Sequence, residues 1–380
     1  MLFRRIAMAE ARTPRSTIPV LSPALRRLLL VVLIGGGLMA VSSLYLLAVT
    51  VAEGLSGVVL QNQAYLVLFL GHVVLGLVLM VPVLLFGALH FRRARRRPNR
   101  YAIQAGVGLY VSLVALFVSG ILLTRFGFFE VNDPDVRGVA YWVHVLAPVA
   151  AVWLFVLHRL AGPTLGWRAG VAWAGVAVGF AALALVLHGL GLQRAPDMVR
   201  AYEPALAMVP AGEAIEPGRL MQDDNCAECH ADIAAQHAGS MHRFSSFNNP
   251  AYRAAVDEAR AVLRERDGDV RAARLCAVCH DQVPLFSGRF DDPHYDPDTD
   301  PGAAAGIGCL GCHAIADVNS PIGNGDYSIV APPRYPFADS ASGIGRFLHR
   351  QLIRAKPAFH KRTLLKPVHA SPEFCAACHK

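Results

Sequence analysis

Residues 28–52 read LLLVVLIGGGLMAVSSLYLLAVTVA and contain no charged side chain. An α-helix of this length spans the roughly 30 Å hydrocarbon core of a bilayer, and a buried helix of a soluble protein rarely runs so far without a charge. Four more apolar stretches follow in the first half of the chain, at 64–90, 102–124, 139–161 and 169–192. The sequence therefore predicts five transmembrane helices within residues 28–192.

The composition of the chain also divides at its middle. Of 380 residues, 54% are hydrophobic and 17% are charged, against roughly 25% charged in an ordinary soluble domain. The apolar excess lies in the first half, which excludes one large soluble globule, a disordered chain and a collagen-like chain. The net charge of +8 does not indicate a nucleic-acid partner, because residues 1–195 hold 17 Arg and 5 acidic residues, whereas residues 196–380 hold 19 basic and 23 acidic ones.

Arginine placement predicts the orientation of the five helices, because basic residues concentrate in cytoplasmic connections. Arginines precede the first span and fill the connection between the second and third, namely Arg4, Arg5, Arg12, Arg15, Arg26, Arg27, Arg92, Arg93, Arg95, Arg96, Arg97 and Arg100. The connection after the third span instead carries Glu130, Asp133 and Asp135. We therefore expect a bacterial inner-membrane protein with residues 1–27 in the cytoplasm and the second half in the periplasm. No convincing cleavage site precedes Glu53, so we expect the first span to be a retained signal anchor.

All eight cysteines lie in four C-x-x-C-H motifs in the second half: Cys226-Ala-Glu-Cys229-His230, Cys276-Ala-Val-Cys279-His280, Cys309-Leu-Gly-Cys312-His313 and Cys375-Ala-Ala-Cys378-His379. This pattern is the attachment signature of a c-type haem, because two thiols at this spacing form thioethers and the next histidine binds the iron. A zinc site would need ligand pairs brought together, and a disulfide framework would not place a histidine after every second cysteine. We expect four covalent haems c in an oxidising compartment.

Four six-coordinate irons would need four distal ligands as well. Outside the motifs, the second half offers His237, His242, His294, His349, His360 and His369. We favour His242, His360 and His369, and His369 is close enough to Cys375 to ligate a neighbouring haem. His294 lies in an acidic turn. The alternating acids that follow it, Asp296, Asp298 and Asp300, lack the rest of an EF-hand, which favours a plain turn over a calcium site.

Histidines within the predicted spans are functional candidates by default. His72 and His90 in the second span are five helical turns apart, and His144 and His158 in the fourth are close to four turns apart. Each pair therefore shares one helix face, at separations of about 27 Å and about 21 Å. Pairing His72 with His144 near the periplasm and His90 with His158 near the cytoplasm would ligate two b-type haems. The alternative is that His90 and His158, each near an arginine, are interfacial side chains.

A fifth histidine, His188, is left over near the end of the last span. It could line a quinone pocket, ligate a haem or lie at the interface.

The expected fold class is all-α. A five-helix transmembrane bundle (28–192) is followed by a linker (193–225) rich in Pro, Ala and Glu, and then by a mainly helical and irregular periplasmic tetrahaem domain (226–380). Residues 252–265 have the period of a scaffold helix. Lys380 directly follows the last motif, so we expect either a truncated chain or a partner that covers the last haem.

The second half resembles large multihaem cytochromes c related to the tetrahaem cytochrome that accepts electrons from hydroxylamine oxidation. The resemblance covers roughly residues 200–380 and rests on the four motifs, the run His242-Arg-Phe-Ser-Ser-Phe-Asn-Asn-Pro-Ala-Tyr252, and the stretch from Lys356-Pro-Ala-Phe-His360 to Lys366-Pro-Val-His369. The membrane half more loosely resembles the dihaem cytochrome b anchors of quinol-linked enzymes. The interval between His144 and His158 matches the respiratory cytochrome b pattern, whereas the longer interval between His72 and His90 does not.

These features predict a membrane-bound protein that transfers electrons between the quinone pool and a soluble periplasmic redox protein. The enzyme activity compatible with them is that of a quinol–cytochrome oxidoreductase. Glu53, Glu130 and Asp133 are candidate proton acceptors. One alternative is a periplasmic oxidoreductase of a nitrogen or sulfur oxyanion with a five-coordinate haem. Another is a tetrahaem relay on a haem-free anchor. The sequence leaves the direction of electron flow and the oligomeric state open.

Overall fold

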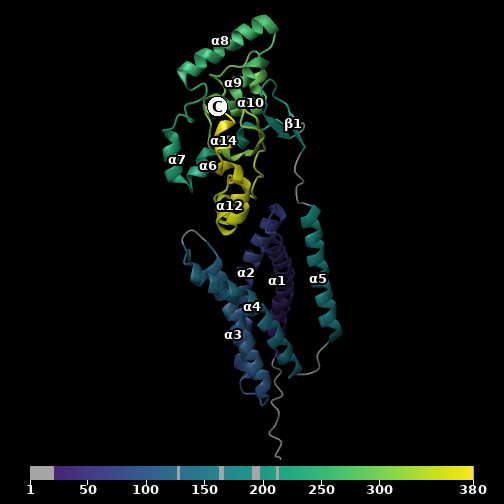
Figure 1. Cartoon of the computed structure of the whole chain (residues 1–380). Coiled ribbons are helices and arrows are strands. Elements are labelled where there is room, and N and C mark those ends of the chain that lie inside the picture. The colour runs from purple at the N-terminus through teal and green to yellow at the C-terminus, as the bar shows by residue number, and fades with distance from the viewer. Residues whose placement is uncertain (1–20, 126–128, 162–166, 191–196, 211–213, 380) are drawn as a thin grey trace, which may run out of the picture. The chain divides into compact units, whose positions relative to one another are not determined.

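The computed structural model describes residues 21–125, 129–161, 167–190, 197–210 and 214–379. The chain forms two compact units: Met1–Leu192 with Asp339–Ala355, and Gln193–Ala338 with Lys356–Lys380. Both units contain many helices (Figure 1). The predictions for Arg4, Arg5, Arg12 and Arg15, for the end of the fifth span at 191–192, for the first linker residues and for Lys380 lie outside the described residues.

Five long helices confirm the five apolar spans, and each is long and apolar enough to cross a membrane. They are α1 (Pro23–Ser56), α2 (Gln63–Ala94), α3 (Arg100–Leu123), α4 (Pro134–Leu160) and α5 (Trp167–Leu190). Side-chain oxygens of Ser22, Asn62, Asn99 and Asp133 accept backbone N–H groups in the first turns of α1 to α4, which would otherwise lack partners. Helix α1 ends at Gly57, whose φ of 69° is in the left-handed region that favours glycine.

Glycines allow the apolar helices of the first unit to approach closely. Helix α1 packs against α2 and α5, and α3 packs along α4 (Figure 1). A Cβ at Gly35 would overlap the Leu79 side chain of α2, and a Cβ at Gly87 would overlap the Tyr110 ring of α3. Large apolar side chains such as Val81 and Trp153 are instead exposed on the outside of the helices, as expected for a surface that faces lipid.

Helix α12 (Gly343–Ala355) belongs to the first unit, although it lies far along the chain from α1 to α5. The Arg354 guanidinium makes a 3.0 Å ion pair with the carboxylate of Glu130, in the connection between α3 and α4. The unit that contains the membrane helices therefore includes a segment that the sequence analysis assigned wholly to the haem domain.

The second unit combines short helices with a small four-stranded sheet in the order β1-β2-β4-β3. Strand β2 pairs antiparallel with β1 and parallel with β4, and β4 pairs antiparallel with β3. The strands are β1 (Met198–Arg200), β2 (Met208–Pro210), β3 (Ile315–Val318) and β4 (Tyr327–Ile329). The α-helices are α6 (Asp223–Ala227), α7 (Ala231–Ala238), α8 (Pro250–Asp267), α9 (Arg274–His280), α10 (Gln282–Phe286), α11 (Cys309–His313), α13 (Pro357–Leu364) and α14 (Pro372–Ala376). The 3-10 helices are η1 (Pro217–Arg219), η2 (Arg271–Ala273), η3 (Arg289–Asp291), η4 (Pro301–Ala304) and η5 (Pro367–Ala370).

The core of the second unit lies around α9, α10 and the sheet, where Leu285, Phe286, Phe290, Tyr327 and Ile329 are fully buried. Helix α8 includes residues 252–265, the segment predicted to be helical. Its buried Arg260 donates hydrogen bonds to the carbonyl oxygens of Phe290 and Asp292, and its guanidinium lies 4.6 Å from the Phe290 ring centroid. These bonds satisfy a charge that would be costly to bury without partners.

The segment interpreted as a linker is part of this core, and the second unit contains strands that the fold class did not include. Tyr202, Ala205, Ala207 and Val209 are buried, and β1 and β2 form one side of the sheet. Such short strands cannot show the alternation by which a strand is recognised. Residues 205–209 are apolar throughout, so the sequence carries no alternating pattern there, although burial alternates at Ala205, Ala207 and Val209.

We predict that Tyr202→Ala destabilises the second unit by about 3 kcal/mol, because it removes a buried ring. The ring makes an edge contact with Phe286 at 5.1 Å, and its hydroxyl donates to the Phe286 carbonyl. Thermal unfolding of the full chain in detergent, followed through the second unit's near-UV circular dichroism, should show a Tm lower by about 6–12 °C. Val199→Ala in β1, where the side chain is half exposed, is the matched control. Equal effects of the two substitutions would contradict a packed segment.

Candidate functional site

The first unit brings its four predicted ligand histidines together in two pairs. The ring centroids of His72 on α2 and His144 on α4 are 6.2 Å apart with an interplanar angle of 78°. Those of His90 and His158 on the same helices are 6.1 Å apart at 79°. The interval between the histidines is longer on α2 than on α4, so α2 must tilt or bend relative to α4 for both pairs to meet. Each helix has an internal proline between its histidines, Pro82 and Pro148.

Hydrogen bonds at Nδ1 orient three of these rings. The Nδ1 atom of His144 donates to the Leu116 carbonyl at 3.2 Å, and that of His158 donates to the Ala102 carbonyl at 2.8 Å. The Nδ1 atom of His72 lies 3.0 Å from the Ser42 hydroxyl. Because a carbonyl oxygen only accepts, Nε2 of the neutral His144 and His158 rings keeps its lone pair for a metal.

Two glycines on α3 make room for the α4 histidines. A Cβ at Gly120 would lie 3.1 Å from Cε1 of His144, and a Cβ at Gly106 would lie 3.1 Å from Cε1 of His158. The interval from Gly106 to Gly120 equals the interval from His144 to His158. Helix α3 therefore presents a small residue at each depth where α4 presents an imidazole.

The second unit brings three of its motif histidines against the three predicted distal histidines. His230 of the first motif lies 6.3 Å from His360 on α13, with nearly parallel rings at 12°. His313 of the third motif lies 5.2 Å from His369, at 88°. His379 of the fourth motif lies 5.9 Å from His242, at 63°. His369 thus lies against the third motif, although the fourth is nearest to it in sequence.

The spacing within the pairs fits a haem iron held between two imidazoles. Imidazole nitrogens bind a first-row transition metal at about 2.0–2.1 Å, so two opposite ligands place their ring centroids about 6 Å apart. Four of the five centroid distances lie between 5.9 and 6.3 Å, and the fifth is shorter. The spacing of the paired rings therefore fits a metal ion held between two imidazoles. In His369, Nδ1 accepts the Lys366 backbone N–H at 3.2 Å, which places the proton of the neutral ring on Nε2.

Burial favours the neutral form of two of the predicted distal histidines, His360 and His369. It lowers the pKa of His360, and the neighbouring rings of His230 and His313 lower it further. Burial also lowers the pKa of His369, again with help from His313. Because only the neutral imidazole offers a lone pair, a lowered pKa favours the protonation state that a metal ion could bind.

Among the residues that the structure describes, no second histidine ring pairs with His280 of the second motif. Within the described residues, the ring that contacts His280 is Tyr252 on α8, stacked at 4.4 Å and 20°. The Nδ1 atom of His280 donates to the Ser245 carbonyl at 2.6 Å, and the Tyr252 hydroxyl donates to Asp281. Burial raises the pKa of Asp281 to about 7. No sequence pattern singled out Tyr252 for this position.

The cysteines adjoin one another out of chain order. The Cys226 side chain of the first motif adjoins Cys309 of the third, and Cys279 of the second adjoins Cys378 of the fourth. Cys312 of the third motif lies near both cysteines of the fourth. The motifs are therefore connected in space in the order first, third, fourth, second.

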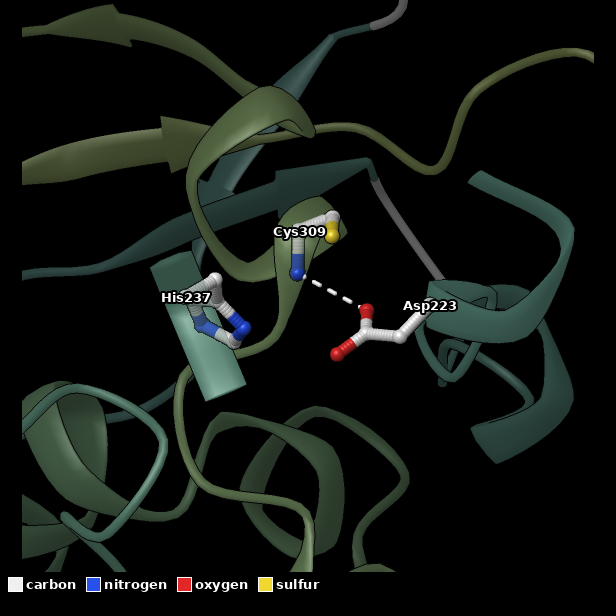
Figure 2. A group of neighbouring side chains, drawn as sticks. All are labelled: Asp223, His237 and Cys309. Carbon is white, nitrogen blue, oxygen red and sulfur yellow. Dashed lines mark hydrogen bonds between the residues drawn. The ribbon is translucent and has the colours of Figure 1, made fainter. Parts of the chain in front are cut away.

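A cluster of Asp223, His237 and Cys309 fixes the start of the third motif (Figure 2). The Asp223 carboxylate accepts the Cys309 backbone N–H at 2.9 Å, and Nε2 of His237 donates to the Ile307 carbonyl at 2.8 Å. Three such ligand types could hold a metal ion, but that would need the Cys309 thiolate, which haem attachment would consume. We interpret the cluster as a scaffold for the attachment helix α11.

The remaining acidic candidates have structural partners. Asp298 accepts two hydrogen bonds from Arg253, and Asp300 accepts from Arg289, as expected for a plain turn next to the exposed His294. Of the three proposed proton acceptors, Glu130 pairs with Arg354 and Asp133 caps α4. Glu53 accepts the backbone N–H groups of Leu60 and Gln61.

No family model, curated protein or solved structure matches this chain.

We predict that Gly120→Leu disrupts the His72–His144 pair, because the added side chain must displace the His144 ring. If a haem b is bound there, about half of the protoporphyrin haem per polypeptide should be lost in a pyridine haemochrome assay, while the covalent haem stays unchanged. Gly175→Leu on α5 is the matched control, since nothing lies within 4 Å of a Cβ at that position. Equal haem content in the two variants would contradict a ligand role for this pair.

Proposed function

We propose that this protein transfers electrons across its membrane unit between quinone and a periplasmic redox protein. The observation that carries the proposal is the repeated histidine pair, which occurs twice among the apolar helices and three times in the second unit. A haem bound between two imidazoles supplies reversible one-electron chemistry without an open coordination position. Quinol oxidation is our leading direction, and the reverse uses the same residues.

His72 with His144 and His90 with His158 would hold two haems b at two depths of the bundle. Cys226 and Cys229, Cys276 and Cys279, Cys309 and Cys312, and Cys375 and Cys378 would hold four haems c covalently, with His230, His280, His313 and His379 as proximal ligands. His360, His369 and His242 would complete the first, third and fourth sites. The adjacency of the motif cysteines supports a relay in the order first, third, fourth, second.

The distribution of charged residues along the chain supports the proposed orientation in a bacterial inner membrane. The arginines before α1 and between α2 and α3 favour a cytoplasmic location for that end of the bundle in a bacterial inner membrane. Covalent haem attachment also suits an oxidising periplasm for the second unit. The excess of acidic residues in the second half, which haem propionates would increase, favours a soluble partner that docks through a basic face.

We predict two haems b and four haems c per polypeptide in a pyridine haemochrome assay of the purified protein. His72→Ala and His144→Ala should each remove one haem b and leave the haem c content unchanged, because both act on the same pair. His294→Ala, in an exposed turn, is the control and should change neither. Absence of protoporphyrin haem from the wild type would instead support the tetrahaem relay on a haem-free anchor.

The contact between His280 and Tyr252 favours a second candidate function. A haem held by Cys276, Cys279 and His280 without a distal histidine would keep one coordination position for a small substrate. Tyr252 stacks on the His280 ring, and its hydroxyl donates to the buried Asp281, so both would lie beside the proximal ligand. The unit could then reduce or oxidise a nitrogen or sulfur oxyanion in the periplasm, with the other haems delivering or removing electrons.

We predict that carbon monoxide shifts the absorption of about one quarter of the reduced haem c, because one site of four has no histidine in the distal position. His369→Ala opens a second site and should roughly double this response. A response of the wild type indistinguishable from zero would exclude the second candidate and leave the relay alone.

A further inference from the structure

Three polar rings are buried where α1, α2 and α5 come together in the first unit. Tyr45 on α1 is 0% exposed, Tyr65 on α2 is 1% exposed and His188 on α5 is 5% exposed. Much of the surrounding surface of these helices is apolar and exposed, as lipid-facing surface would be. A buried ionisable side chain in such helices is costly and is usually retained for a function.

The Tyr45 hydroxyl and Nδ1 of His188 lie 2.7 Å apart, with ring centroids at 5.7 Å. The backbone carbonyl of His188 also accepts a hydrogen bond from the Asn62 side chain at 3.3 Å. Nε2 of His188 is buried and makes no hydrogen bond of normal geometry with the described residues, and the Leu60 backbone and the Glu53 carboxylate are polar neighbours of the ring. Two groups thus hold the residue in place, while its second ring nitrogen is left for a ligand.

A tyrosine–histidine pair suits a ligand that alternates between a carbonyl and a hydroxyl oxygen. When the Tyr45 hydroxyl donates to Nδ1, the neutral ring carries its proton on Nε2 and can donate to a carbonyl. When Nδ1 instead donates to the phenol oxygen, Nε2 can accept from a hydroxyl. A quinone head group presents the first kind of oxygen and a quinol presents the second.

The neighbours of His188 distinguish it from the four paired histidines. In the described part of the chain, the ring that contacts His188 belongs to a tyrosine and not to a second imidazole. The acidic residues considered as proton acceptors are held in structural contacts, whereas Nε2 of His188 is not.

The His188 site lies close to the His72–His144 pair along α1. Ser42 contacts Nδ1 of His72, and Tyr45 follows three residues later, so the two side chains lie on neighbouring positions of one helix face. A head group bound at His188 would therefore lie about one helical turn from a proposed haem ligand.

We propose that His188 is the hydrogen-bond partner of a quinone or quinol head group, with Tyr45 as the residue that positions its ring. This inference rests on the proposed function, because that function supplies the quinone. It names the residue that recognises the head group and does not depend on the acidic residues of the connections.

The test measures binding of a fluorescent quinone analogue, 2-heptyl-4-hydroxyquinoline N-oxide, to the full-length haem-loaded protein in detergent. His188→Leu should weaken binding about 10-fold or more, because it removes the hydrogen-bonding nitrogen. Tyr45→Phe should weaken it less, about 3-fold, and His188→Gln should restore part of the affinity that His188→Leu loses. Tyr110→Phe is the matched control, since this hydroxyl donates to the Leu84 carbonyl elsewhere in the bundle.

Haem content measured on the same samples separates the possible failures. If the wild type binds the analogue and His188→Leu binds it equally well, the inference is wrong and the proposed function stands. If His188→Leu loses protoporphyrin haem, His188 acts in haem binding and the inference is also wrong. If the wild type does not bind the analogue, the quinone link of the proposed function fails together with the inference.

Discussion

The separation of paired imidazole rings is the constraint on which the arrangement of both units depends. At the centroid distances of these pairs, two rings are too far apart to bond each other and close enough to share one metal ion. Backbone carbonyls hold three of these rings from behind, at Nδ1 of His144, His158 and His313. The scaffold around the pairs, from Gly106 and Gly120 on α3 to the backbone of α13, is organised to hold imidazoles in place.

The two units achieve the same spacing by different means. In the first unit, helix periodicity places the ligands, because residues separated by whole turns return to one face. In the second unit the helices are too short to carry two ligands whole turns apart. There the histidine pairs join segments that are far apart in sequence, and a core of short strands and helices holds these segments together. This difference explains why histidine positions within the spans were readable as pairs, whereas a pairing such as His369 with His313 depends on the tertiary fold.

The sequence was most informative where a repeating pattern along one helix determines the structure by itself. The lengths of the apolar stretches predicted the five long helices. The helix period predicted which histidines of these helices share a face. It was least informative where single side chains or very short strands decide the packing. Tyr202 and Val209 lie in a stretch whose composition suggested a linker, and Tyr252 reaches His280 only because α8 folds back over the second motif. Helix α12 likewise belongs to the first unit, where Arg354 pairs with the distant Glu130, and no local pattern in the sequence encodes that pairing.

The proximity of the first and last parts of the second unit has a consequence for its biogenesis. His242 contacts His379, the Gly325 N–H donates to the Ala377 carbonyl, and β2 pairs in parallel with the distant strand β4. These contacts cannot form until the residues up to His379 have been synthesised, so they close late in the folding of this unit. Haem attachment at the four motifs, which we propose, would then act on a chain whose last tertiary contacts have not yet formed.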